Sequence, residues 1–115
     1  MPLPKIKRIK REKDFERIFK TGRAFKHPLF LLKISKNDFS YCRAAVSAPI
    51  SLSKKAVIRN KVKRTFWAAL GEIFPRCRPG VDLVIIISPA AADKNIYRIT
   101  ESLKEIFIKA NIVEK

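Results

Sequence analysis

The chain of 115 residues carries 26 lysines and arginines against 10 aspartates and glutamates, a formal net charge of +16. With 47% hydrophobic residues it predicts one folded domain and excludes a disordered basic tail. Such an imbalance predicts a polyanionic partner, nucleic acid first and an anionic membrane second. No apolar run reaches the roughly 18 residues that span a bilayer, and no signal-peptide core follows the basic start. We therefore expect a cytoplasmic protein without a membrane partner.

Residues 1–13 read as a basic, flexible arm that precedes a single domain at residues 14–115. Pro2 and Pro4 favour an extended start. The cations of the arm need no fold to meet phosphate, so we expect it to become ordered on its partner. They are Lys5, Lys7, Arg8, Lys10, Arg11 and Lys13.

Residues 14–20 predict a short helix that ends at Gly22. Phe15, Ile18 and Phe19 share one face by their i+3 and i+4 spacing. Such a trio is usually core, but cations flank it on both sides. Aromatic rings interleaved with cations suit single-stranded nucleic acid, because every base has a face to stack on. One phenylalanine could therefore line a groove while the other packs.

Strand patterns follow this first helix. Residues 25–35 predict two strands separated by Pro28, and residues 41–48 predict a third that ends at Pro49. The nearly continuous apolar run at residues 81–87 predicts a central, parallel strand covered on both faces. Within it, Asp82 reads as a local turn or cap group.

Residues 53–75 predict one long helix, with Ser53 as its cap and Pro75 as its end. Its apolar stripe should face the core, whereas its first half is cationic and has no acid. Cations in a first turn oppose the helix dipole, and cations four residues apart repel each other. A polyanion that contacts this face would offset both costs. The stripe consists of Ile58, Val62, Phe66, Ala69 and Ile73.

A last amphipathic helix, capped by Asp93 or Asn95, closes the chain and carries mixed charges typical of a solvated face. The expected order is α-β-β-β-α-β-α. Cys42 and Cys77 read as free thiols, and a single histidine, His27, supports neither a zinc site nor a catalytic triad. We find no clustered carboxylates for a two-metal nuclease. These side chains predict binding without catalytic residues or a protein-held metal.

Residues 55–64, KAVIRNKVKR, resemble the signature of the bacterial ribonuclease P protein component. The resemblance extends over nearly the whole chain. A D-F-x-x-I-F-K-x-G segment begins at Asp14, an R-x-x-V-S segment at Arg43, and a G-x-D segment at Gly80 before the apolar run.

The resemblance implies a single α+β domain in two layers, whose four-stranded mixed sheet includes a left-handed β-α-β crossover. It also implies the small subunit of an RNA-based endonuclease that removes the 5′ leader of precursor tRNA. The catalytic RNA would cut with magnesium ions, and no obligatory protein partner is expected. The subunit would bind that RNA through the basic helix and the leader through a cleft between the first helix and the sheet.

Carried onto this sequence, the resemblance assigns two residue sets. Those that would contact the catalytic RNA are Lys54, Lys55, Arg59, Asn60, Lys61, Lys63, Arg64 and Trp67. Those that would line the leader cleft are Phe15, Phe19, Lys20, Lys33 and Arg43. Many family members have an arginine where this chain has Trp67, which would either stack on a base or ribose or cover a hydrophobic edge.

Two other readings remain open from the residues alone. A structural RNA-binding protein of the ribosome would share the basic α/β composition but would need no aromatic cleft. A DNA-binding protein would need base-reading side chains on its recognition helix. Asn60 and Arg64 could read bases, but the face around them is uniformly cationic.

Overall fold

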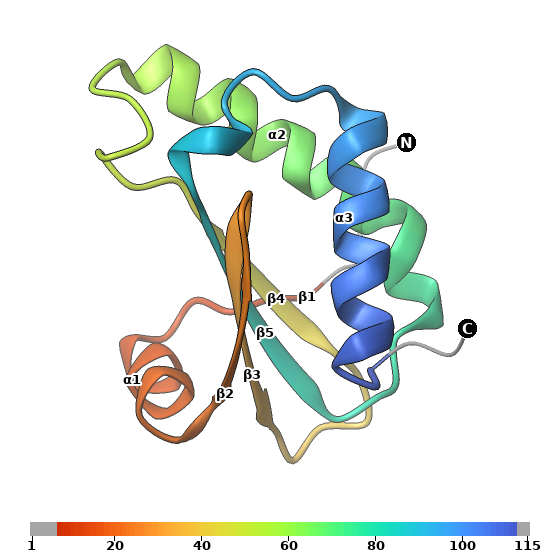
Figure 1. Cartoon of the computed structure of the whole chain (residues 1–115). Coiled ribbons are helices and arrows are strands. Elements are labelled where there is room, and N and C mark those ends of the chain that lie inside the picture. Colours follow the sequence, from red (N-terminus) through yellow and green to blue (C-terminus); the bar gives the residue numbers. More distant parts are fainter. Residues whose placement is uncertain (1–6, 113–115) are drawn as a thin grey trace.

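The computed structural model describes residues 7–112, in which three α-helices flank one mixed sheet (Figure 1). The helices are α1 (Glu12–Thr21), α2 (Ala56–Ile73) and α3 (Ile96–Lys109). The strands are β1 (Lys7–Arg8), β2 (Arg23–His27), β3 (Phe30–Lys36), β4 (Arg43–Ser47) and β5 (Val81–Ile87). Two short 3-10 turns, η1 (Phe74–Arg76) and η2 (Pro89–Ala91), complete the order. The predicted α+β class and element order are confirmed.

The strands lie in the order β1-β4-β5-β3-β2. β5 pairs parallel with β4 and antiparallel with β3, so it is central, as its continuous apolar run predicts. Because α2 connects the parallel neighbours β4 and β5, the expected crossover unit is present. The sheet contains the four predicted strands and a short fifth strand, β1, which was not predicted and pairs parallel with β4 at the sheet edge.

The basic arm predicted for residues 1–13 lies partly outside the described residues. Of its described part, Lys7–Arg8 form β1, Ile9 is buried, and α1 already begins at Glu12. The side chain of Ile9 enters a small core beneath α1. This part of the arm therefore belongs to the folded domain.

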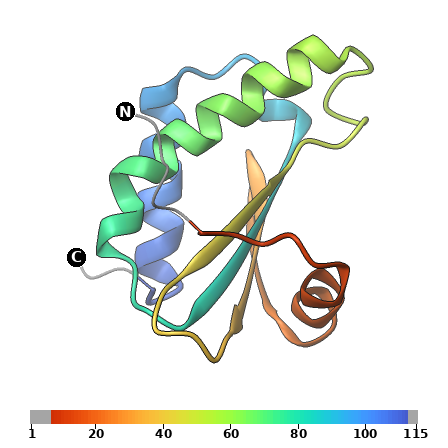
Figure 2. The ribbon, with the colours of Figure 1, turned by 180° about the vertical axis from the view of Figure 1, so that it is seen from behind.

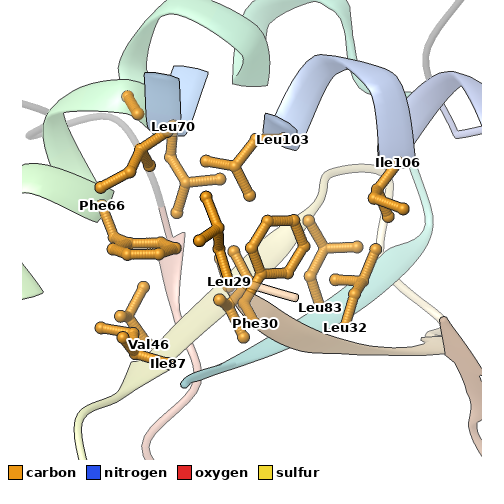
Figure 3. Packing of buried hydrophobic residues seen from close by; sticks show 14 of the residues in the cluster. Leu29, Phe30, Leu32, Val46, Phe66, Leu70, Leu83, Ile87, Leu103 and Ile106 are labelled. Atoms are coloured by element: carbon orange, nitrogen blue, oxygen red, sulfur yellow. The ribbon is translucent and has the colours of Figure 1, made fainter. Parts of the chain in front are cut away.

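Two layers of side chains sandwich the sheet. On one face α2 and α3 pack against alternate residues of β3, β4 and β5, which forms the main core (Figure 3). Phe66 of α2 meets Phe30 of β3 edge-on, with ring centroids 6.0 Å apart. On the opposite face α1 lies alone, as the view from behind also shows (Figure 2). Ile9, Ile18, Ala45 and Val84 form the second, smaller core there.

The boundaries of α2 differ from the prediction. Ser53 is not its cap: the helix begins at Ala56, and the Ser53 hydroxyl accepts a hydrogen bond from the Lys55 amide at 3.1 Å. The helix ends at Ile73, and Pro75 lies in η1. Four of the five predicted stripe residues are buried, but Ile58 remains 37% exposed. The first turn of α2 projects beyond the sheet, so no core lies beneath it (Figure 1).

The end of α1 and the start of α3 lie where the sequence predicts them. Gly22 closes α1, where a methyl group would collide with the carbonyl oxygens of Ile18 and Ile34, so only glycine lets the helix end this close to β3. Asn95 caps α3, since its side chain accepts a hydrogen bond from the Arg98 amide at 3.0 Å.

Candidate nucleic-acid interface

The cationic side chains of α2 and of the loop before it gather on the solvent side of the helix. Lys54, Lys55, Lys61 and Arg64 are exposed, and none of the basic residues between positions 54 and 64 forms a salt bridge with a carboxylate of residues 7–112. The first turn of α2 contains no acid. Its free amides and its cations therefore add to the same positive potential. This surface, which we call the α2 face, is suited to a polyanion.

One of the predicted RNA contacts on the α2 face also has a structural partner. Arg59 is half-buried and donates a hydrogen bond from Nη1 to the Ser53 carbonyl oxygen at 2.8 Å. It thereby holds the loop before α2 against the helix. Lys63 is half-buried, whereas Asn60 is exposed. The structure thus places all the polar residues predicted for this surface on one helix and its entry loop.

Trp67 lies at the border of the α2 face. Its ring packs against the main core, and the guanidinium of Arg8 lies over it, 4.2 Å from the ring centroid. The indole N–H is buried without a hydrogen-bond partner among the described residues. Because Arg8 covers one face of the ring, the contacts favour the alternative in which Trp67 covers a hydrophobic edge. Arg8, presented by β1, brings one more cation to this side of α2.

A second surface, which we call the α1 cleft because the leader cleft is predicted there, consists of α1 and the residues that the sheet presents beside it. Phe15 is half-buried against the small core, whereas Phe19 is 44% exposed. The Lys33 ammonium group on β3 donates a hydrogen bond to the Phe19 carbonyl oxygen at 3.2 Å, and Lys20 is exposed beside it. One phenylalanine therefore packs and the other shows its ring to solvent, next to two lysines.

Arg43, the remaining residue predicted for the cleft, is held below α1 in an ion network. Its guanidinium donates to both carboxylate oxygens of Asp82, at 2.9 Å and 2.6 Å, and it contacts Asp14 of α1 at 3.3 Å. Arg17 of α1 also donates to Asp82 and, at 2.9 Å, to Ser35. The network therefore ties α1 to β3, β4 and β5. Because the Arg43 side chain is only 13% exposed, its part in the cleft is structural.

Asp82 was wrongly interpreted as a local turn or cap group. It is fully buried and anchors the network. Burial by itself raises the pKa of this carboxyl, but hydrogen bonds from Arg43, Asn37 and Arg17 outweigh it, so the pKa lies below its usual value. An acid inside an apolar strand of a strongly basic chain is the sequence signal that could have indicated a buried ion pair.

Two carboxylates near the cleft are engaged by arginines. Asp82 and Asp14 already accept bonds from arginines, which leaves a divalent cation facing positive charge. Within residues 7–112, no three His, Cys, Asp or Glu side chains gather as metal ligands would. In the same region, none of the helices is both long and apolar enough to cross a bilayer.

The fold and these two surfaces define a small, basic α+β protein with a cationic helix on one side of its sheet and, on the other side, an exposed aromatic ring beside lysines. The family model described as Ribonuclease P matches residues 3–111, and the chain belongs to this family.

Relatives of known sequence and structure agree with this assignment. The ribonuclease P protein component of Microcystis aeruginosa is 36% identical over 118 residues, which covers 98% of each chain. That of a Synechocystis strain is 30% identical and covers 99% of this chain and 93% of its own. The RNase P protein of Staphylococcus aureus superposes with a TM-score of 0.84 at 27% identity, covering 96% of this chain and 100% of that one.

Proposed function

We propose that this chain is the protein subunit of ribonuclease P, which binds the catalytic RNA and the 5′ leader of precursor tRNA. It would thereby support endonucleolytic removal of the leader, while the RNA performs the chemistry with magnesium. The observation that carries the proposal is the α2 face, a set of cations on the helix that bears the family signature and without a salt bridge to any carboxylate of residues 7–112. Family membership adds to this observation.

The α2 face would hold the catalytic RNA. Structured RNA presents closely spaced phosphates, and cations without a carboxylate partner release counterions when they meet them. The amides of the first turn point out of the helix N-terminus and favour negative charge there. Since this face lies across the sheet from α1, contact with it leaves the α1 cleft accessible (Figures 1 and 2).

The α1 cleft would receive the single-stranded leader. The exposed ring of Phe19 offers a stacking surface, and Lys20 and Lys33 lie within reach of the phosphates that flank a stacked base. Stacking does not depend on base identity, which suits leaders of varied sequence. Phe15 would support this surface from below, since it packs on the small core.

Magnesium would be held by the RNA subunit. Asp14 and Asp82, the carboxylates at the cleft, are occupied by arginines. We therefore assign no step of the cleavage to a side chain of this protein. Its contribution is to neutralise phosphate charge and to position the substrate, both of which should lower the magnesium concentration that the RNA needs.

Cleavage of a precursor tRNA by the matching catalytic RNA at low magnesium, with and without the protein, tests the proposal. We expect the protein to restore cleavage at the 5′ end of the mature tRNA. Tight RNA binding with an unchanged cleavage rate would instead support a structural protein of the ribosome. Preference for duplex DNA over both RNAs would support the DNA-binding alternative.

A further inference from the structure

Arg8, on the edge strand β1, lies on the same side of the sheet as α2. Its guanidinium lies over the ring of Trp67, 4.2 Å from the ring centroid. Successive side chains of an extended chain point to opposite faces, and the next residue, Ile9, enters the small core beneath α1. The side chain of Arg8 therefore faces away from the α1 cleft and toward α2.

The main chain that carries Arg8 is fixed to the sheet. Arg8 is the register partner of Ala44 on β4, and the amide of Ile9 donates a hydrogen bond to the Ala44 carbonyl oxygen at 3.0 Å. The buried side chain of Ile9 holds the same segment from the other face. Because its main chain is paired and its side chain is stacked, Arg8 would lose little conformational entropy on binding a ligand.

The guanidinium of Arg8 is accessible to a ligand from solvent. Arg8 is exposed, and it forms no salt bridge with a carboxylate of residues 7–112. The five N–H groups of a guanidinium lie within its plane, so a contact with an aromatic ring does not use them as hydrogen-bond donors. A phosphate group can accept two of them side by side. The contact with the ring thus holds a group suited to phosphate at the surface.

Covering a hydrophobic edge does not by itself explain a tryptophan at position 67. The indole N–H of Trp67 is buried without a hydrogen-bond partner among the described residues, which costs stability that a phenylalanine would not lose. Tryptophan is, however, the aromatic side chain that attracts a cation most strongly. The contact with Arg8 therefore explains the residue type better than the cover that the ring provides.

We infer that Arg8, held in place by Trp67, binds a phosphate of the catalytic RNA and extends the α2 face across the sheet edge to β1. The inference rests on the proposed function. Lys63 and Arg64 precede Trp67 by one helical turn, so these three side chains are neighbours on the surface of α2. Arg8 over the ring adds a third cation beside the two on the helix. In this site Arg8 is the binding residue and Trp67 is a positioning residue.

Filter binding of the catalytic RNA to the full chain, over a range of salt concentrations, tests the inference. Arg8→Ala should weaken the affinity about three- to tenfold. It should also make the plot of log affinity against log salt shallower by about 0.7 to 0.9, the value for one phosphate. Trp67→Leu keeps an apolar side chain without a ring and should cause part of both losses. In the double variant the losses should not add, because both substitutions remove one contact.

The chain offers two matched controls for this binding experiment. Arg23→Ala removes another exposed arginine that lies over an aromatic ring, 5.1 Å from the centroid of Phe25, but on β2 at the opposite edge of the sheet. It should leave the affinity and its salt dependence unchanged. Trp67→Phe keeps an aromatic face under Arg8 and should retain most of the affinity.

Fluorescence tests the contact between Arg8 and Trp67 without any RNA. Trp67 is the only tryptophan of the chain, so its emission reports on this site alone. Arg8→Ala uncovers one face of the ring, and acrylamide should then quench the emission more strongly. A cooperative unfolding transition of the variant shows that it is folded. Unchanged quenching in the folded variant would mean that the contact is absent in solution, which would overturn the inference.

The binding results separate the inference from the proposed function. If Arg8→Ala binds the catalytic RNA like the wild type, whereas Arg59→Ala/Arg64→Ala does not, the inference is wrong and the proposed function stands. If Arg8→Ala weakens binding of precursor tRNA but not of the catalytic RNA, the phosphate belongs to the substrate, and the inference is again wrong. A wild-type protein that does not bind the catalytic RNA would remove both.

Discussion

Arg43 grips both oxygens of the buried Asp82 carboxylate, with its Nε and Nη2 atoms at 2.9 Å and 2.6 Å. These two residues face each other across the parallel pair β4 and β5, where they are register partners. Arg17 approaches the same carboxylate from α1. This buried charge therefore contributes, together with the small core under α1, to holding α1 over the sheet.

Asp82→Asn should destabilise the protein by about 3 to 5 kcal/mol, because it removes the buried anion of Arg43 and Arg17 and leaves them only the longer contacts with Asp14. Chemical unfolding at neutral pH measures the loss. Asp93→Asn is the matched control, since Asp93 is exposed and, among residues 7–112, its one salt bridge is with Lys94. Its effect should stay within about 0.5 kcal/mol. Equal stability of the two variants would show that the network contributes nothing.

The depressed pKa of Asp82 also predicts how stability depends on pH. A carboxyl whose pKa is lower in the folded state stabilises the protein above its unfolded value of about 3.9. This stabilisation is lost as the pH falls below that value and through the folded pKa. Unfolding free energies measured from pH 7 down to pH 2 should therefore fall steeply below about pH 4. In Asp82→Asn the unfolding free energy should decrease less as the pH falls. An unchanged pH dependence would contradict the role of Asp82.

Replacing Arg59 and Arg64 with alanine should weaken binding to the catalytic RNA about ten- to a hundredfold. The plot of log affinity against log salt should become shallower by about 1.4 to 1.8, since two fewer phosphates are neutralised. Filter binding over a range of salt concentrations measures both. Arg98→Ala/Lys104→Ala on α3 removes the same charge away from the α2 face. If this control matched the α2 variant, net charge alone would explain the binding.

Phe19→Ala should reduce the preference for precursor over mature tRNA about five- to a hundredfold, because the exposed ring would no longer stack on a leader base. Affinity for the catalytic RNA alone should not change, since α2 lies on the other face of the sheet. Phe19→Tyr keeps an aromatic face and should restore the preference. Competition between the two tRNAs measures it, and loss of affinity for both alike would argue against two separate surfaces.

Cys42 should be alkylated before Cys77. A hydrogen bond from the Cys77 side chain lowers the pKa of Cys42 despite its partial burial, whereas the same bond and deeper burial raise the pKa of Cys77. The rate of alkylation at Cys42, followed by mass spectrometry, should therefore rise at a pH below that of an ordinary thiol. Cys77→Ala removes the hydrogen bond and should move this rise to higher pH. Faster labelling of Cys77 would contradict the predicted order.

Local signals were sufficient to predict most of the fold. Pro28 separates β2 from β3, Gly22 ends α1, and Asn95 caps α3, because each depends on chemistry within a few residues of the chain. Ile58 was predicted in the core because helical periodicity describes a face of the helix, whereas burial depends on what lies opposite that face. The sheet does not reach the first turn of α2.

The ion network could not be predicted in the same way. It joins residues 17, 37, 43 and 82, which come from different elements and meet only through the register of β4, β5 and the position of α1. Arg43 was therefore assigned to the surface of the cleft, although it is largely buried beneath it. The contact between Arg8 and Trp67 likewise depends on β1, a two-residue strand without a sequence pattern of its own.

The unequal size of the two cores has a consequence for how the molecule fluctuates. Ile9, Ile18, Ala45 and Val84 are the buried apolar side chains under α1, whereas α2 and α3 share a larger core with β3, β4 and β5. Detaching α1 exposes little apolar area and breaks mainly ionic bonds, so it should cost less than global unfolding. We therefore expect α1 to form a cooperative unit of its own, which can detach from the sheet while α2 stays in place.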